Sequence, residues 1–246
     1  MSVLEQVPAL RVIGGFELRV ADRPVVLPTN ARRLLAFLAV MGGAQRRDSV
    51  AGRLWSWTTD ARARATLRTA LWRVRQAHSD VVRTDRDVLA LGPSVRLDLT
   101  ESTARARALI DGVPGAEVVG AIGGAGLQGA DLLGADLLPG WDEDWLQLER
   151  ERHRQLRIHG LEALSRRLTA DGHYAAAIDV AYRAIAAEPL RESAHRALIR
   201  AHLAEGDRVS AARQLDSYAR LLDEQLGVRP SPALEELVLV RDVARA

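Results

Sequence analysis

Residues 61–78 read ARARATLRTALWRVRQAH, and this stretch determines the fold of the front half of the chain. Its apolar residues recur every three or four positions, which predicts an α-helix with one buried stripe. The stripe consists of Ala63, Leu67, Ala70, Leu71 and Val74. The remaining surface carries five arginines and no acidic residue. We therefore expect a helix that packs by one side and presents a basic surface on the others.

The segments around this helix predict strands first, then three helices, then a hairpin. Short β-branched segments at 10–20 and 23–28 predict a small antiparallel sheet with a turn at Ala21–Asp22. A first helix is expected after a cap at Thr29 or Asn30 and a second after Asp48 or Ser49, while Asp60 is the expected cap of the third. Residues 81–99 alternate in polarity and predict two strands. This order is that of a winged helix with a leading sheet, in which the third helix reads the major groove and the hairpin is the wing.

Candidate DNA-contacting residues follow from that assignment. The third helix supplies Arg62, Arg64, Arg68, Thr69, Arg73 and Arg75; the hairpin supplies Arg83, Thr84 and Arg86; and the earlier helices supply Arg46 and Arg47, with Arg32 and Arg33 as further phosphate clamps. A solvated helix face would be the alternative explanation of the arginines. However, residues 61–78 contain no acidic residue, so ion pairing within this segment is not available. This absence favours DNA contact.

Charge is divided unequally along the 246 residues. Residues 1–100 hold 16 Arg against 9 acidic residues, whereas residues 101–246 hold 18 Arg against 23 acidic residues. The chain has no Lys, and the abundance of Arg by itself is explained by the codon bias of a GC-rich genome. The asymmetry, in contrast, indicates an anionic partner for the front half, and duplex DNA is the commonest such partner.

The tryptophans have two interpretations each. Trp55, Trp57 and Trp72 could be stacking platforms, but duplex DNA hides its base faces, so we expect them to be core or half-buried residues. Trp141 and Trp145 are expected to anchor a long helix against its neighbours rather than to bind a ligand.

The back half is predicted to be entirely helical. Helices are expected at about 101–111, 142–170, 173–187, 191–205, 208–226 and 231–244, with stops at Gly172, Gly206 and Gly227. Gly172 and Gly206 lie 34 residues apart, which is the period of the tetratricopeptide repeat. The glycine-rich segment 115–130 is expected to be a loop in a linker. The fold class is therefore mainly α: an N-terminal winged helix with small β-sheets (1–100), a connecting helix and Gly-rich linker (101–140), and a tetratricopeptide-like all-α repeat domain (141–246).

Catalysis, cofactors and membrane insertion are not indicated. The six His residues form no HExxH pair, the glycines open no basic phosphate loop, and cysteine is absent. We therefore expect no catalytic residue, no metal and no cofactor. There is no apolar run of membrane-spanning length and no secretory signal in the first ten residues, so we expect a cytoplasmic protein.

Longer motifs resemble a known family. In the front half they are RRLLAFLAV (32–40), SVAGRLW (49–55) and ARATLRTALWRVRQ (63–76). In the back half they are LLPGWDEDWLQLERERHRQL (137–156), YAAAIDVAYRAIAAEPLRESAHRALIRAHLAEGDR (174–208) and LLDEQLGVRPSPALEEL (221–237). Together they are similar to the SARP family, the actinobacterial antibiotic regulatory proteins. The front half resembles the winged helix of response regulators, and the back half resembles the bacterial transcriptional activator domain.

The resemblance implies an activator of secondary-metabolite (antibiotic) biosynthesis genes. Such a protein would bind direct repeats in promoter DNA, as a homodimer or as two adjacent monomers, and would recruit RNA polymerase. A second hypothesis stays open at this point. The helical repeat could be the working surface of a scaffold or adaptor that binds a protein or peptide partner.

Overall fold

A computed structural model describes residues 7–114 and 133–239. The chain divides into two compact units. Unit 1 comprises residues 1–102 and 125–153, and unit 2 comprises residues 103–124 and 154–246. Two helices, α4 (Asp98–Ile110) and α5 (Asp144–Ala170), run through the residue boundaries between the units. The functional domain boundaries expected at residues 100 and 141 are a separate matter and stay predictions.

Unit 1 begins with a four-stranded sheet in the order β3-β2-β1-β7. Its strands are β1 (Ala9–Arg11), β2 (Glu17–Val20), β3 (Arg23–Val25) and β7 (Arg96–Leu97). The expected hairpin turn is confirmed: Ala21 and Asp22 both have positive φ, of 48° and 61°, as a tight two-residue connection requires. β7 pairs parallel with β1 and was not expected, because a two-residue strand has too little sequence to show a pattern.

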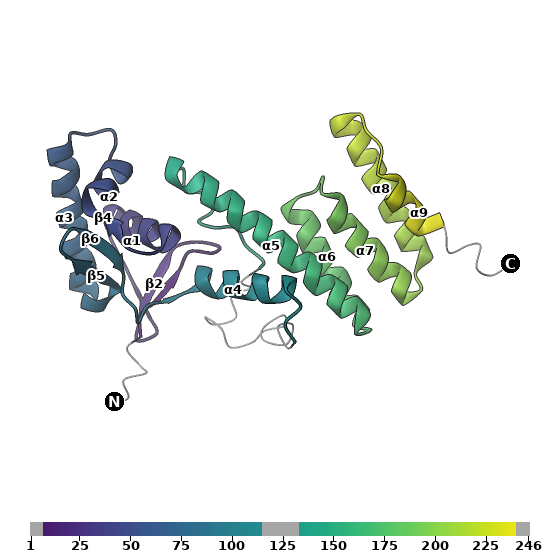
Figure 1. Ribbon diagram of the computed structural model, residues 1–246, viewed down its shortest axis with the longest axis horizontal. Helices are drawn as coiled ribbons and strands as arrows, with labels where there is room; N and C mark the ends of the chain where they lie inside the picture. Colours follow the sequence, from purple (N-terminus) through teal and green to yellow (C-terminus); the bar gives the residue numbers. More distant parts are fainter. Residues whose placement is uncertain (1–6, 115–132, 240–246) are drawn as a thin grey trace. The chain divides into compact units, whose positions relative to one another are not determined.

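The three expected helices of unit 1 are α1 (Thr29–Met41), α2 (Arg47–Leu54) and α3 (Asp60–Ala77). The buried residues of α3 are the five stripe residues deduced from its periodicity, which confirms that prediction. They join a core with Leu34, Phe37 and Leu54. The winged-helix-like arrangement of three helices and small sheets is visible in Figure 1.

The predicted caps of these helices are wrong in detail. α1 is preceded by Pro28, and no side chain caps its first turn. Asn30 instead uses Oδ1 to accept a hydrogen bond from Trp55 Nε1 at 3.2 Å, so a tertiary contact takes the group that could have capped the helix. Asp60 is the first helical residue of α3 rather than its cap, which is Thr59.

The wing is a three-stranded sheet in the order β4-β6-β5. The expected hairpin is confirmed as β5 (Val82–Asp85) and β6 (Val88–Leu91), and β4 (Gln45–Arg46) adds a third strand to it. Arg86 occupies the turn with φ of 47°. At the open end of the hairpin, Gly92 N donates to Val81 O at 2.9 Å, which extends the pairing of β5 and β6 by one step.

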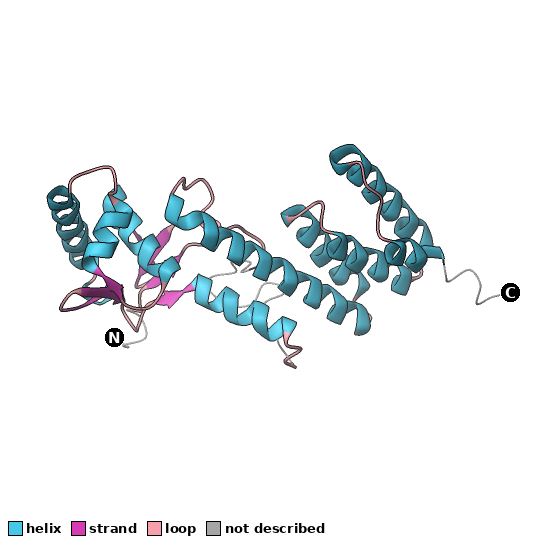
Figure 2. Cartoon of the chain, turned by 45° about the horizontal axis from the view of Figure 1, so that its top comes forward, coloured by secondary structure: helices cyan, strands magenta, loops and turns pink. Residues whose placement is uncertain are grey.

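Unit 2 is all-α. It contains the continuation of α4 and α5, followed by α6 (Tyr174–Ala187), α7 (Glu192–Glu205), α8 (Arg208–Leu226) and α9 (Pro232–Leu239). Consecutive helices from α6 to α9 pack against each other, as expected for a helical repeat, and Figure 2 shows these elements as helices joined by short loops. Gly172, Gly206 and Gly227 have positive φ of 81°, 96° and 66°, which confirms them as helix stops. The linker 115–130 lies outside the described residues, as do residues 240–244 of the expected last helix.

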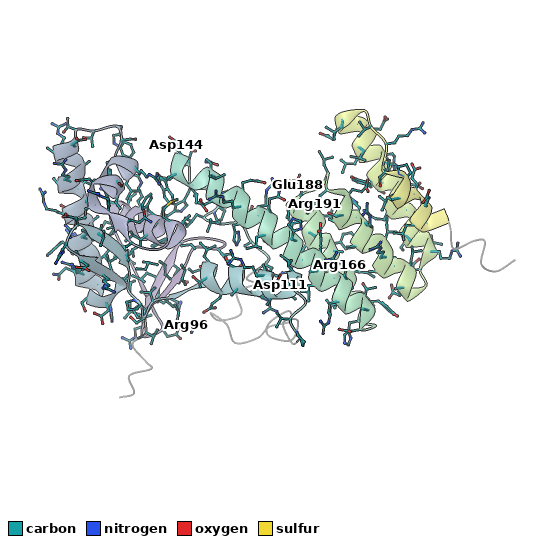
Figure 3. The ribbon with its side chains drawn as sticks, viewed as in Figure 1. Arg96, Asp111, Asp144, Arg166, Glu188 and Arg191 are labelled. Carbon is teal, nitrogen blue, oxygen red and sulfur yellow. The ribbon has the colours of Figure 1, made fainter. Side chains whose placement is uncertain are left out.

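Polar bonds fix the loop between α6 and α7. Arg191 Nε donates to Glu162 Oε1 at 2.7 Å, and Tyr218 donates its hydroxyl to Leu190 O at 3.1 Å. Glu188, labelled with Arg191 in Figure 3, pairs with Arg154. Ion pairs and hydrogen bonds within unit 2 thus hold a loop that the repeat pattern alone would leave unspecified.

Candidate nucleic-acid interface

The arginines proposed for DNA contact lie on the solvent side of α3. Arg62, Arg64, Arg68, Arg73 and Arg75 are all exposed, and so is Thr69. Thr69 Oγ1 donates to Ala65 O within the helix at 3.2 Å, so the hydroxyl hydrogen is used internally and its oxygen remains an acceptor. The structure therefore brings the six sequence-predicted residues of this helix onto its accessible surface.

Three of these arginines have side-chain partners that the sequence did not reveal. Arg64 Nε donates to Asp48 Oδ1 of α2 at 3.0 Å, and Arg75 Nη2 donates to Thr84 Oγ1 of the wing at 2.8 Å. The Arg73 guanidinium lies 4.7 Å from the centroid of the Trp72 ring. Spacing within one helix could not have found the first two partners, because they lie 16 and 9 residues away on other elements.

Arg62 and Arg68 differ from the others. Neither guanidinium has a hydrogen-bond or ion-pair partner within residues 7–114 and 133–239. Arg73 has no acidic partner in that part of the chain either. These three side chains therefore present uncompensated positive charge to solvent, which is the electrostatic condition for binding a polyanion.

The wing presents a second group of cations. Arg83 is 67% exposed, and its nearest acidic atom is 4.0 Å away on Asp85. Thr84 is half-buried, and Arg86 is exposed at the turn. The bond between Arg75 and Thr84 joins this group to the end of α3. The wing and α3 are thus positioned as one surface within unit 1.

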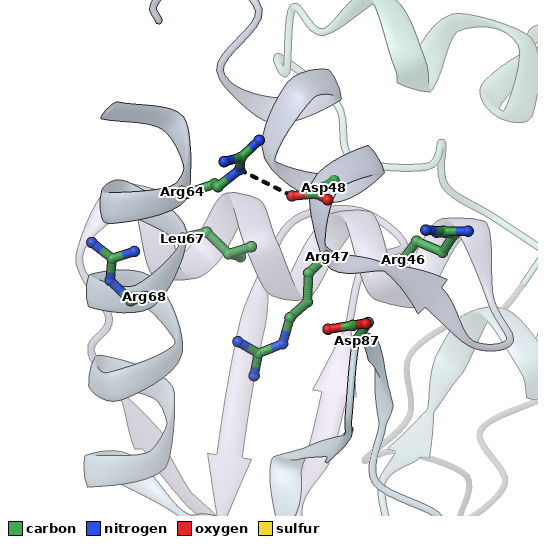
Figure 4. Close-up of a pocket in the computed structure, with 7 residues that line it drawn as sticks. All are labelled: Arg46, Arg47, Asp48, Arg64, Leu67, Arg68 and Asp87. Carbon is green, nitrogen blue, oxygen red and sulfur yellow. Dashed lines mark hydrogen bonds and ion pairs between the residues drawn. The ribbon is translucent and has the colours of Figure 1, made fainter. Parts of the chain in front are cut away.

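A small pocket of about 210 Å³ lies where α2, α3 and the wing meet. It is lined by Arg46, Arg47, Asp48, Arg64, Leu67, Arg68 and Asp87, as drawn in Figure 4. Four arginines against two aspartates leave the pocket net positive. Arg47 fixes its geometry, because the Arg47 backbone N donates to Asp87 O at 2.8 Å. Arg47 Nε is buried without a hydrogen-bond partner among the described residues.

Arg32 and Arg33 do not belong to this surface. Arg33 Nε and Nη2 donate to both carboxylate oxygens of Glu143, at 2.5 and 2.7 Å, and the Arg33 side chain is only 12% exposed. Arg32 lies over the rings of Phe16 and Trp141, at 5.3 and 5.8 Å from their centroids. The Arg33 guanidinium is thus occupied by Glu143, whereas Arg32 is exposed, and its role as a phosphate clamp stays a prediction.

The expectation that the front-half tryptophans are core or half-buried residues is correct for one of three. Trp55 is 3% exposed, whereas Trp57 is 69% and Trp72 is 51% exposed. Trp141 and Trp145 pack on the core of unit 1, with Trp145 edge-on to Phe37 at 5.2 Å, as expected for anchors of a helix. Trp72 was missed because its large apolar ring was assigned to packing, although its spacing places it opposite the buried stripe of α3.

Two kinds of site are absent from the described ranges. Among residues 7–114 and 133–239, no group of three or more His, Asp or Glu side chains is placed to hold a metal ion. No helix in the same part of the chain is long and apolar enough to cross a membrane.

The fold and this surface define a winged-helix-like N-terminal unit followed by a helical region, and comparisons with known proteins agree with that class. Residues 123–239 match the family described as bacterial transcriptional activator domain. A solved structure, described as Mycobacterium tuberculosis EmbR in complex with low affinity phosphopeptide, has a similar fold with a TM-score of 0.73 and 19% sequence identity. The similarity covers 96% of this chain and 66% of that chain. A search of curated proteins finds no significant match.

The structural likeness confirms the expected fold class: mainly helical, with small N-terminal sheets and an all-α C-terminal region. The matched domain is described as a transcriptional activator domain and covers just under half of the chain, and the structural likeness at 19% identity shows the fold alone. Neither comparison tests the individual DNA-contacting residues.

Proposed function

We propose that this chain is a sequence-specific DNA-binding transcriptional activator. In this proposal α3 of unit 1 lies in the major groove, the wing and the start of α2 hold backbone phosphates, and the region matching the activator domain contacts RNA polymerase. The observation that carries the proposal is the uncompensated charge of Arg62, Arg68 and Arg73 on the outer face of α3. Clustered like charges repel each other, and a polyanion relieves this repulsion when it binds.

The candidate contacts fall into two physical classes. Arg46 and Arg47, at the pocket beside the first turn of α2, and Arg83 and Arg86 of the wing are assigned to phosphates. Such contacts fix the register on the duplex but carry no sequence information. Arg68 and Arg73 are assigned to base edges, where an arginine recognises guanine through O6 and N7.

The arrangement on DNA is proposed to be tandem. Two copies, as a dimer or as adjacent monomers, would set their α3 helices into successive major grooves of a direct repeat, with centres about 10–11 base pairs apart or at a multiple. The domain boundaries predicted from the sequence belong to this proposal: residues 1–100 bind DNA, and residues 141–246 act in activation. The finer assignment is to the SARP family, with a secondary-metabolite biosynthesis cluster as the target.

DNA binding is tested by fluorescence anisotropy of the full chain on labelled promoter duplexes between 50 and about 300 mM salt. Each neutralised phosphate contributes about −0.9 to the slope of log K against log salt, so a steep negative slope is expected. Arg68→Ala/Arg73→Ala should abolish sequence-specific binding. Arg213→Ala/Arg220→Ala removes two exposed arginines from α8 of unit 2 and is the matched control, which should bind as the unaltered chain does.

Two results would contradict the proposal. A salt-insensitive or absent interaction with duplex DNA would favour the scaffold or adaptor hypothesis. Full specific binding by Arg68→Ala/Arg73→Ala would show that α3 is not the reading element. Activation is tested separately by in vitro transcription with RNA polymerase holoenzyme on a template that carries the bound repeat, where the full chain should raise the transcript yield.

A further inference from the structure

Trp72 occupies an unusual position on α3. Its side chain is 51% exposed, although it belongs to a helix whose five core residues are almost completely buried. At 100° per residue, Trp72 lies near the centre line of the outer face together with Ala65, Thr69 and Gln76. It is the one large apolar side chain on that line.

The immediate surroundings hold Trp72 in an outward position. The Arg73 guanidinium lies over the indole at 4.7 Å from its centroid, a cation–π contact that restricts both side chains. Ala65 and Thr69, which precede it on the centre line, are small, so the helix can approach a flat partner closely along its first turns. The indole then projects beyond them toward whatever the outer face contacts.

The chemistry of the partner follows from what surrounds the indole. Arg68, one turn before Trp72, and Arg73, which contacts its ring, place positive charge beside Trp72, and neither has an acidic partner in the described part of the chain. A polyanion matches this charge, and duplex DNA in addition offers an apolar group. The major groove displays hydrogen-bond donors and acceptors on all four bases, but its apolar group is the C5-methyl of thymine.

We propose that Trp72 is a specificity-determining residue that recognises thymine by packing its indole against the C5-methyl group in the major groove. The inference rests on the proposed function, since it requires α3 to lie in that groove. The inference goes beyond the proposed function because it assigns a particular base to a residue that is not an arginine. Binding sites should accordingly contain thymine at a fixed position next to the bases read by Arg73.

The test uses a duplex that the full chain selects from a random 40-base-pair library. The thymines of the selected duplex are replaced one at a time by deoxyuridine, which removes the methyl group and leaves the Watson–Crick pairing unchanged. At the contacted position, uracil should weaken binding by about fourfold, equivalent to about 0.8 kcal/mol for one methyl group. Trp72→Ala should bind the thymine and uracil duplexes equally well.

Trp57→Ala is the matched control, because it removes another exposed indole of unit 1 that lies outside α3. It should keep the fourfold preference for thymine. Thermal unfolding of each variant verifies that the fold is retained, which is expected since both side chains are exposed.

Three outcomes overturn the proposal, and they are distinguishable. Failure of the unaltered chain to select any duplex contradicts DNA binding itself and with it the role of Trp72. Selection of a duplex that shows no uracil effect at any position, or an uracil effect that persists in Trp72→Ala, contradicts only the thymine assignment. Unchanged DNA binding by Trp72→Ala together with reduced transcription would identify Trp72 as a protein-contacting residue instead.

Discussion

Asp98 accepts a hydrogen bond from the backbone N of Ile13 at 2.9 Å, so the first turn of α4 is tied to the chain directly after β1. The same carboxylate accepts from Val12 N at 3.0 Å. Asp98 is fully buried, and burial raises its pKa from 3.8 to about 6, although the backbone hydrogen bonds and the charge of Arg11 act in the opposite direction.

Because its pKa is higher in the folded state than in the unfolded state, Asp98 binds a proton more readily when the chain is folded. Its contribution to stability is therefore fully present below about pH 4 and is lost as the pH rises through about 6. The shift in pKa corresponds to a change in the free energy of unfolding on the order of 3 kcal/mol. An NMR titration of the Asp98 side-chain carboxyl should show a midpoint near pH 6. A midpoint near 4 would show that the hydrogen bonds cancel the effect of desolvation.

Arg33 and Glu143 provide a second prediction. The Arg33 and Glu143 side chains are 12% and 15% exposed, and two hydrogen bonds between them join α1 to the residues before α5 within unit 1. Glu143→Gln should lower the free energy of unfolding by about 1–3 kcal/mol, because a mostly buried guanidinium loses its charged partner. Urea denaturation measures this loss. The double variant Arg33→Met/Glu143→Gln should lose less than the sum of the two single variants, and strict additivity would show that the pair is not coupled.

Features that depend on neighbouring residues could be predicted from the sequence, whereas contacts between distant residues could not. The stripe of α3 was predicted correctly because helical periodicity is a property of neighbouring residues. The partner of Arg33 lies 110 residues away, and that of Arg64 lies 16 residues away on another helix, so neither could be deduced from spacing. The strands β4 and β7 have two residues each and form only because a partner strand is present.

For the candidate interface, the sequence shows which residues are basic but not which of them are paired with another side chain. All five arginines of α3 are exposed, yet Arg64 is paired with an aspartate and Arg75 with a threonine. The exposure of Trp72 was missed because residue type favoured the interior, whereas its place on the helix is opposite to the stripe.

Trp55 and Trp57 should respond differently to the same substitution. Trp55 is buried and donates to Asn30, so Trp55→Ala should cost about 3–5 kcal/mol of unfolding free energy. Trp57 is largely exposed and contacts the Arg33 guanidinium at 4.7 Å from the ring centroid, so Trp57→Ala should cost less than about 1 kcal/mol. Equal losses of unfolding free energy in thermal or urea denaturation would contradict the assignment of Trp55 to the core and of Trp57 to the surface.

Gly92 and Gly52 offer a matched pair of glycine-to-alanine substitutions in unit 1. A Cβ at Gly92 would lie 1.7 Å from the carbonyl oxygen of Asp80, a distance that the backbone can relieve only by moving the end of β6 away from residues 79–81, which join α3 to the wing. Gly92→Ala should therefore destabilise the unit by about 1–3 kcal/mol or more. Gly52 lies on the exposed side of α2 with nothing within 4 Å of its Cβ position, so Gly52→Ala should stabilise the helix by up to about 1 kcal/mol.

Urea denaturation of both variants gives opposite signs if the wing is packed as described, because the same added methyl group meets backbone at one site and solvent at the other. A tolerated Gly92→Ala would mean that the wing is not held at this distance, and the surface shared by Arg75 and Thr84 would then have to be reassigned.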